Sequence, residues 1–190
     1  MKKKCPYCGY MNIAGADVCR KCLAPLADKD LPTPTTGDSI QRKIMTVSVA
    51  KILSGDAPAI VSQDDSIADA IMQMQYDAAR GCVLVCNKKR ELVGLVSVRD
   101  ILLKVAGTMK KPSAVSVSKI MTKNPESVSL DATLAFVLHK MSIGRFRHVP
   151  VVDKGRPIGV LAMRDVISYL TTGKRLKSHK AAPKTKSKKK

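Results

Sequence analysis

Four of the six cysteines have the spacing of a metal site. Cys5 and Cys8 form one Cys-x-x-Cys pair, and Cys19 and Cys22 form a second. A tetrahedral zinc ion takes four soft ligands, and each such turn can bring two thiolates to one metal while its backbone amides point back at the sulfurs. Because protein would fill all four positions, the sequence predicts a structural zinc centre and no catalytic role for it.

The residues around these cysteines predict a small metal-held unit over residues 1–27. Gly9 follows the first pair and suits a turn with positive φ. The segment has too little apolar stock to fold alone, and metal binding can supply the missing free energy. Residues 4–27 resemble the short zinc-ribbon family found at the ends of prokaryotic regulatory chains, with Leu23 where such ribbons often have a second glycine. The alternatives are a disulfide pair, a redox-active thiol motif, and iron in place of zinc.

Two further candidates for chemistry, Asp100 and Asp165, end nearly identical stretches. Residues 94–100 read Gly-Leu-Val-Ser-Val-Arg-Asp, and residues 159–165 read Gly-Val-Leu-Ala-Met-Arg-Asp. The segments that open the two copies, 46–54 and 114–122, also align. A repeat of this length predicts a tandem domain with two equivalent clefts.

The elements that must position these carboxylates follow from the apolar periodicity. In the first copy, helical spacing begins after a capping candidate, Asp65 or Ser66, and two short apolar runs read as buried strands before a second helix. The second copy repeats this order, so each unit reads β-α-β-β-α. The expected helices cover 67–74, 98–105, 134–141 and 163–170, and the expected strands cover 82–85, 92–96, 149–152 and 158–161.

Residues 44–173 resemble a tandem pair of cystathionine-β-synthase (CBS) domains, the Bateman module. The second copy carries the resemblance best, through Ile120-Met121-Thr122, Asn124-Pro125 and His148 to Asp153, followed by Gly159 to Asp165. The resemblance implies an α/β (α+β) fold of two β-α-β-β-α repeats packed as a pseudo-two-fold pair, and a homodimer. The expected domains are a zinc ribbon at 1–27, a linker at 28–43, CBS repeats at 44–110 and 111–173, and a disordered Lys-rich tail at 174–190.

The resemblance also implies an adenosine-binding role for particular residues. In that family the last aspartate of the stretch binds both ribose hydroxyls, which a bidentate carboxylate suits, and the preceding Ser or Thr helps to hold phosphate at the helix N-terminus. Ala162 replaces this hydroxyl in the second copy, so the two clefts should differ. Arg80 is expected to align with Arg147. The implied ligand-binding residues are Asp100, Ser97, Arg80, Asp165, Arg147 and His148, with purine walls from Val47, Val49, Val115 and Val117.

Plainer interpretations exist for several of these residues. Asp100 and Asp165 would also suit the first turn of a helix through the helix dipole alone. His148 could be a structural histidine beside an apolar strand. Cys82 and Cys86 are expected to be small core residues of one strand.

The charge is the main compositional feature. The chain has 34 Lys and Arg against 15 Asp and Glu, a net charge of +19. A tail so rich in lysine is expected to be disordered and to attract nucleic acid or another polyanion, or else to be merely solvated. No apolar run is long enough to cross a bilayer, and we expect a cytoplasmic protein with no membrane partner. The basic residues of the tail are Lys174, Arg175, Lys177, Lys180, Lys184, Lys186, Lys188, Lys189 and Lys190.

Two functions compete on these grounds. No arrangement typical of an enzyme is present in the sequence, so we expect no catalysis. The first hypothesis is a regulatory module that senses AMP, ADP, ATP or S-adenosylmethionine and signals to a partner through the ribbon or the tail. The second is a nucleic-acid or ribosome-associated adaptor in which the CBS pair is a dimerising scaffold.

Overall fold

The computed structural model describes residues 2–5, 7–13, 16, 18–24, 26, 39–76 and 81–175. The chain divides into two compact units. Within the described part of the chain, the first unit comprises residues 2–53, Glu126–Val151 and residues 161–175, and the second comprises Ser54–Pro125 and Val152–Val160. Neither unit is a continuous stretch of sequence.

The second unit contains a four-stranded sheet in the order β3-β4-β5-β6. Strand β3 runs parallel to β4, and the other neighbours are antiparallel. Its core consists of β-branched and other aliphatic side chains from the sheet and from α3, including Val61, Ile67, Val83, Val85 and Val96. The elements are β3 (Ile60–Ser62), α3 (Ile67–Tyr76), β4 (Cys82–Cys86), β5 (Leu92–Ser97), α4 (Val98–Lys104), the 3-10 turns η1 (Pro112–Ala114) and η2 (Val117–Lys119), and β6 (Thr122–Lys123).

The glycine that opens the repeated motif, Gly94, is required by close packing. A Cβ at this position would lie 2.3 Å from the Sδ atom of Met121. Strand β5 therefore accepts the Met121 side chain directly over its backbone, which only glycine allows without a shift.

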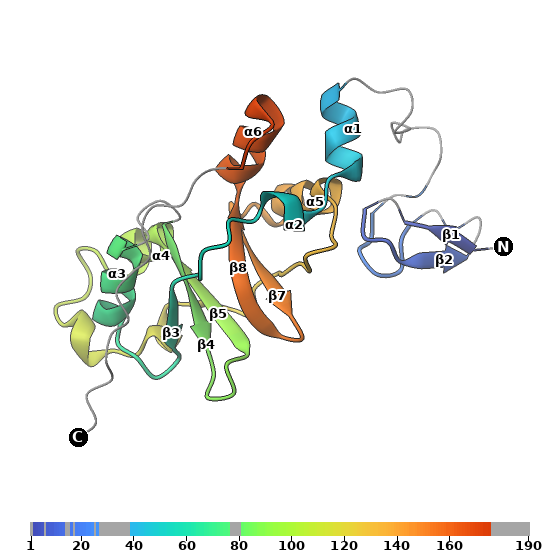
Figure 1. The fold of residues 1–190 in the computed structure, drawn as a ribbon. Helices are drawn as coiled ribbons and strands as arrows, with labels where there is room; N and C mark the ends of the chain where they lie inside the picture. The colour runs from blue at the N-terminus through green and yellow to red at the C-terminus, as the bar shows by residue number, and fades with distance from the viewer. Residues whose placement is uncertain are drawn as a thin grey trace. The chain divides into compact units, whose positions relative to one another are not determined.

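The first unit contains the cysteine-rich hairpin and the two long helices of the second repeat (Figure 1). Helix α5 contacts α1 and α6, and α2 contacts α6. The largest fully buried side chains of this unit include Ile52, Leu134, Met141 and Leu161. Strands β7 (His148–Asp153) and β8 (Arg156–Ala162) pair with each other, and the ends that the turn connects belong to the second unit. The other elements are β1 (Lys2–Lys4), β2 (Met11–Ile13), α1 (Ser39–Thr46), α2 (Val49–Ile52), α5 (Leu134–Gly144) and α6 (Met163–Thr172).

The segment that opens each repeat is hydrogen-bonded to the other repeat. The backbone N–H of Val49 donates to the carbonyl of Ala132 at 2.9 Å, and Leu134 donates to Val47 at 3.0 Å. The opening segment of the first repeat is thus hydrogen-bonded to the start of α5, in the second repeat.

The reciprocal pairing occurs in the other unit. The N–H of Ile67 donates to the carbonyl of Val115 at 2.9 Å, and Val117 donates to Asp65 at 2.8 Å. Each first helix is therefore held by the opening segment of the other repeat, which explains why neither compact unit is continuous in sequence.

The mixed α/β fold and the expected helices and strands are confirmed, with shifts of a few residues at their ends. Ser66, one of the two capping candidates, caps α3, because its Oγ accepts from the N–H of Asp69 at 3.2 Å. Cys82 and Cys86 are buried core residues of β4, as expected. Residues 39–43 of the expected linker are helical, as part of α1. Arg80, the rest of the linker and the tail from 176 onward lie outside the described residues.

Candidate functional site

The four cysteines of the two Cys-x-x-Cys pairs converge on one point. Their Sγ atoms all lie within 4.8 Å of one another. The Sγ atoms of Cys5 and Cys22 are 3.7 Å apart, and those of Cys8 and Cys19 are 3.6 Å apart. Four thiolates at about 2.3 Å from a tetrahedral zinc ion would be separated by about 3.8 Å. The residues therefore fit a tetrathiolate metal centre.

Two equivalent turns hold these cysteines. The N–H of Gly9 donates to the Cys5 carbonyl at 2.9 Å, and the N–H of Leu23 donates to the Cys19 carbonyl at 2.8 Å. Gly9 has φ +72°, as the sequence predicted, and Leu23 takes the same left-handed conformation with φ +58°. The second turn therefore forms without a glycine, at a cost in backbone strain.

Asn12 braces the second pair of cysteines, and the sequence reasoning missed it. Its side chain is buried, donates to the Sγ of Cys19 at 3.4 Å and accepts from the N–H of Arg20 at 3.0 Å. Burial raises the pKa of Cys19, but hydrogen bonds from the backbone of Cys22, from Asn12 and from the backbone of Lys21 outweigh it and lower the pKa to about 6. A thiolate is thus favoured at this position before any metal binds.

The cysteine-rich unit contacts the start of α5. The Thr133 hydroxyl, which caps α5 by accepting from the N–H of Phe136, donates to the Tyr7 carbonyl at 2.8 Å. The Tyr7 ring lies 5.5 Å from the His139 ring, one to two turns further along α5. Tyr7 lies between two of the cysteines, so the metal turn itself makes the contact. No periodicity in the sequence could reveal this pairing across 126 residues.

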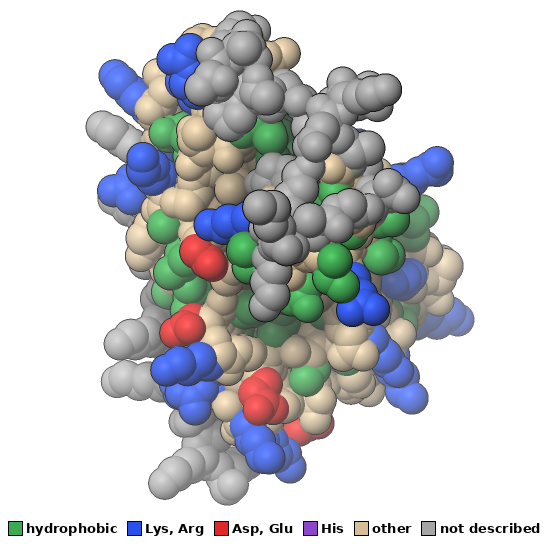
Figure 2. Space-filling model, turned by 90° about the vertical axis from the view of Figure 1, so that its right-hand side faces the viewer, with side chains coloured by type: hydrophobic (Ala, Val, Ile, Leu, Met, Phe, Trp, Pro, Cys, Tyr) green, Lys and Arg blue, Asp and Glu red, His purple; other side chains and the backbone are tan. Residues whose placement is uncertain are grey.

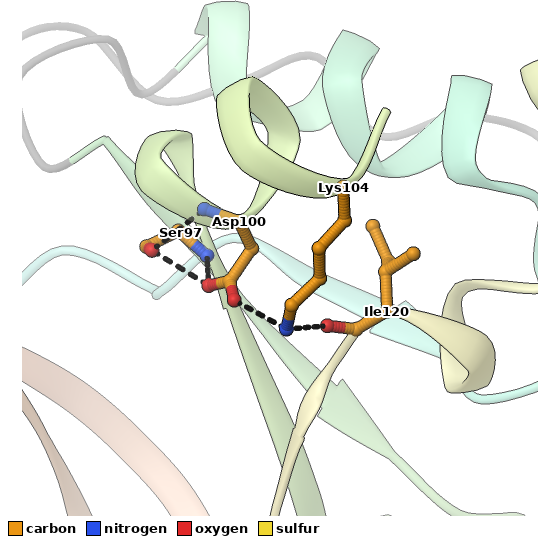
Figure 3. Close-up of polar contacts among 4 residues, drawn as sticks. All are labelled: Ser97, Asp100, Lys104 and Ile120. Carbon is orange, nitrogen blue, oxygen red and sulfur yellow. Dashed lines mark hydrogen bonds and ion pairs between the residues drawn. The ribbon is translucent and has the colours of Figure 1, made fainter. Parts of the chain in front are cut away.

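The first repeated carboxylate, Asp100, lies in the first turn of α4 and is already engaged (Figure 3). Its Oδ2 accepts from the Ser97 N–H at 3.0 Å and from the Ser97 hydroxyl at 2.7 Å. Its Oδ1 accepts from the Lys104 Nζ at 2.7 Å. Burial raises the pKa of Asp100, but the bonds from Lys104 and Ser97 outweigh it and lower that pKa below its ordinary value.

The second repeated carboxylate, Asp165, occupies the same place in α6 with fewer partners. Its Oδ2 accepts from the Ala162 N–H at 2.8 Å. The nearest cation among the described residues, the Nε of Arg164, lies 3.9 Å from Oδ1, too far for a hydrogen bond. Because Ala162 has no hydroxyl, the Asp165 amide also lacks the side-chain acceptor that Ser97 offers to Asp100.

The backbone corrects the expected alignment of Arg80 with Arg147. The N–H of Met163, which begins α6, donates to the Arg147 carbonyl at 2.8 Å, whereas Val98, which begins α4, donates to Gly81 at 3.0 Å. Gly81 is therefore the equivalent of Arg147, one residue away from Arg80.

The other expected ligand-binding and tail residues range from exposed to fully buried. Arg147 is exposed and adjoins the N-terminus of α6, and His148, the first residue of β7, is half-buried. Lys174 and Arg175, the described residues of the basic tail, are exposed. The adenosine-binding roles stay predictions. Among the expected purine contacts, Val49 and Val117 are fully buried, Val47 is nearly so, and Val115 is half-buried.

Comparison with known proteins identifies the fold. Residues 43–107 and 117–172 match the CBS domain family, so the chain belongs to this family and carries two copies of the domain. CBS pairs are regulatory modules. None of the helices in the described part of the chain combines the length and apolarity that a membrane span requires.

The similar proteins also contain CBS domains. A CBS domain-containing protein of Arabidopsis thaliana, CBSCBSPB5, is 33% identical over 68% of this chain, and the match spans 23% of that relative's length. The crystal structure of a CBS-domain containing protein from Agrobacterium tumefaciens is 31% identical, with a TM-score of 0.58 over 65% of this chain and 92% of that chain. The CBS domain pair of protein MJ0100, solved with 5′-methylthioadenosine and S-adenosylmethionine, is 27% identical, with a TM-score of 0.58 over 67% of this chain and 98% of that chain.

Proposed function

We propose that this CBS pair is a non-catalytic regulatory module that binds an adenosine-containing ligand, with Asp165 as the principal ribose anchor. The observation that carries the proposal is the carboxylate of Asp165, which sits at a helix N-terminus with an oxygen that accepts no hydrogen bond from the described residues. A ribose offers two adjacent hydroxyl donors, and a carboxylate has about four acceptor positions, divided between its two oxygens.

The surroundings of Asp165 suit the rest of such a ligand. The Asp165 amide, uncapped by any side chain at position 162, lies at the positive end of the α6 dipole, where an anion is favoured. The exposed Arg147 lies beside the same helix end and offers a cation for phosphate. The ligands of the MJ0100 CBS pair support the adenosine class. The ligands we propose are AMP, ADP, ATP or S-adenosylmethionine.

We propose the zinc ribbon as the part that responds to the ligand. The segment 47–49 is bonded to the start of α5, and Thr133 at that point donates to Tyr7 in the ribbon. A ligand that shifts this segment would alter the contact with Thr133 and so bias the position of the ribbon. A zinc ion would hold the ribbon together through its four thiolates, and the chain's own residues would transmit the signal.

Thermal unfolding against AMP, ADP, ATP and S-adenosylmethionine tests the proposal. A ligand at about 100 times its dissociation constant should stabilise the protein by about 2.7 kcal/mol, a shift of several degrees. We expect Asp165→Ala to abolish most of this shift, and Asp64→Ala, which removes an exposed carboxylate elsewhere, to leave it unchanged. The absence of a shift with all four ligands would reject the proposal.

The net charge of +19 favours a second function, binding to nucleic acid. On the face drawn in Figure 2, Lys and Arg side chains are more frequent than Asp and Glu and are spread over the surface. If the chain binds duplex by neutralising phosphates, its affinity should fall with salt by a power of about 0.9 per phosphate, and removal of residues 174–190 should reduce that slope. A salt-independent affinity would exclude this function.

We also propose that the protein forms a homodimer. Helix α4 exposes three apolar side chains, Val98, Leu102 and Leu103, the last with 71% of its surface accessible. Light scattering of Leu102→Glu should then give the monomer mass, and scattering of the unaltered protein should give twice that mass.

A further inference from the structure

Lys104 ties the first repeated carboxylate to a neighbouring segment. Figure 3 shows its Nζ between two acceptors, the Oδ1 of Asp100 and the carbonyl of Ile120, each at 2.7 Å. Ile120 directly follows η2, which belongs to the opening segment of the second repeat. One ammonium group therefore bridges the first turn of α4 and the opening segment of the second repeat, both within the second unit.

The bond from Lys104 leaves Asp100 with too few free acceptor positions for a ribose. A carboxylate has about four lone-pair positions. Ser97 uses two of them, on Oδ2, and Lys104 uses a third, on Oδ1. One position remains, and a ribose diol needs two. Asp100 can accept a ribose in bidentate fashion only if Lys104 or Ser97 withdraws.

The second repeat lacks this device. Position 169 is four residues after Asp165, as 104 is after Asp100, and it holds a tyrosine, which has no ammonium group to donate to the carboxylate. Asp165 accepts a single hydrogen bond among the described residues, from Ala162, so both ribose hydroxyls find acceptor positions on it. The two repeats therefore present the same carboxylate in different states of engagement.

We propose that Lys104 is a specificity-determining residue that withholds Asp100 from a ribose, so that an adenosine ligand fills the Asp165 site first. The inference rests on the proposed function, because it ranks two sites of that function. The Lys104 side chain is 45% exposed, so the pair is a partly solvated one that a ligand can displace at modest cost. A displaced pair worth about 0.2–1 kcal/mol corresponds to a change in affinity of up to about fivefold.

The test measures the Asp100 site in isolation by calorimetric titration. The probe is 5′-methylthioadenosine, which has the ribose diol and no phosphate that a released Lys104 could contact. Asp165→Ala removes the stronger site and leaves the weaker one. On that background we expect Lys104→Met to raise the affinity two- to fivefold, and Lys104→Arg, which retains the charge, to leave it low. Lys110→Met, which removes an exposed charge, is the matched control and should have no effect.

The outcomes separate the two proposals. If the unaltered protein binds neither 5′-methylthioadenosine nor AMP, the proposed function fails and this inference fails with it. If the unaltered protein binds the probe through Asp165, and Lys104→Met on the Asp165→Ala background binds it no more tightly than Asp165→Ala alone, only the inference fails. Thermal unfolding of each variant without ligand verifies that it is folded.

Discussion

The left-handed conformation of Leu23 predicts that Leu23→Gly will tighten metal binding. Leu23 closes the second cysteine turn with φ +58°, where Gly9 closes the first with φ +72°. An L-residue in this region costs about 1–2 kcal/mol. Glycine avoids that cost but carries about 0.4–1 kcal/mol of additional chain entropy in the unfolded state. The Leu23 side chain is 73% exposed, so its removal loses little packing.

The expected net gain in folding free energy for Leu23→Gly is therefore about 1 kcal/mol. A ribbon of this size depends on its metal for folding, so a gain in folding free energy appears as a gain in metal affinity. The affinity for zinc should rise about fivefold, as measured by competition with a chromogenic chelator at fixed pH.

Two matched variants isolate the backbone effect. Leu23→Ala removes the same side chain but keeps the φ penalty, so its affinity should stay within about twofold of the unaltered protein. Gly9→Ala introduces the penalty into the first turn, where a Cβ would meet its nearest neighbour at an ordinary 3.6 Å, and after the same entropy correction should weaken binding about fivefold. Equal affinities for Leu23→Gly and Leu23→Ala would show that the conformation of Leu23 carries no strain and would refute the reasoning.

Three further predictions follow from single contacts. Asn12→Ala removes the buried side chain that donates to the Sγ of Cys19 and accepts from the N–H of Arg20, and should cost about 1–3 kcal/mol, seen as a loss of zinc affinity of about fivefold or more in the same chelator competition. Thr133→Val removes both the cap of α5 and the bond to the ribbon and should cost about 1 kcal/mol on thermal unfolding, whereas Thr133→Ser, which retains the hydroxyl, should cost much less. The pKa of Asp100 is lowered, so its contribution to stability is present above its ordinary pKa of 3.8 and is lost as the pH falls below that value. The stability difference between the unaltered protein and Asp100→Asn, measured by urea unfolding, should therefore be largest near neutral pH and shrink below about pH 4.

The sequence predicts well those features that depend on local pattern. The two cysteine pairs, the positive φ of Gly9 and the order of helices and strands all follow from spacings of a few residues. The bond from Lys104 to Asp100 is also local, since residues four apart on a helix face one another, and a search for such pairs would have found it.

Features that depend on distant pairing were not predictable in this way. The exchange of the opening segments joins Val47 to Leu134, and no periodicity within either segment records its partner. The alignment of Arg80 with Arg147 was wrong by one residue, because backbone bonding at Gly81 fixes the equivalence and the two repeats differ in length there. The sequence gives no signal for Asn12, since its role exists only once the hairpin brings it to Cys19.

The crystal structure of the zinc-loaded protein grown with the adenosine ligand that stabilises it most would test the central claim most directly. We expect the ribose hydroxyls to lie within hydrogen-bond distance of the Asp165 carboxylate, with any phosphate near the N-terminus of α6. A ligand bound without contact to Asp165, or bound at Asp100 with Lys104 displaced while Asp165 has no ligand, would contradict the account.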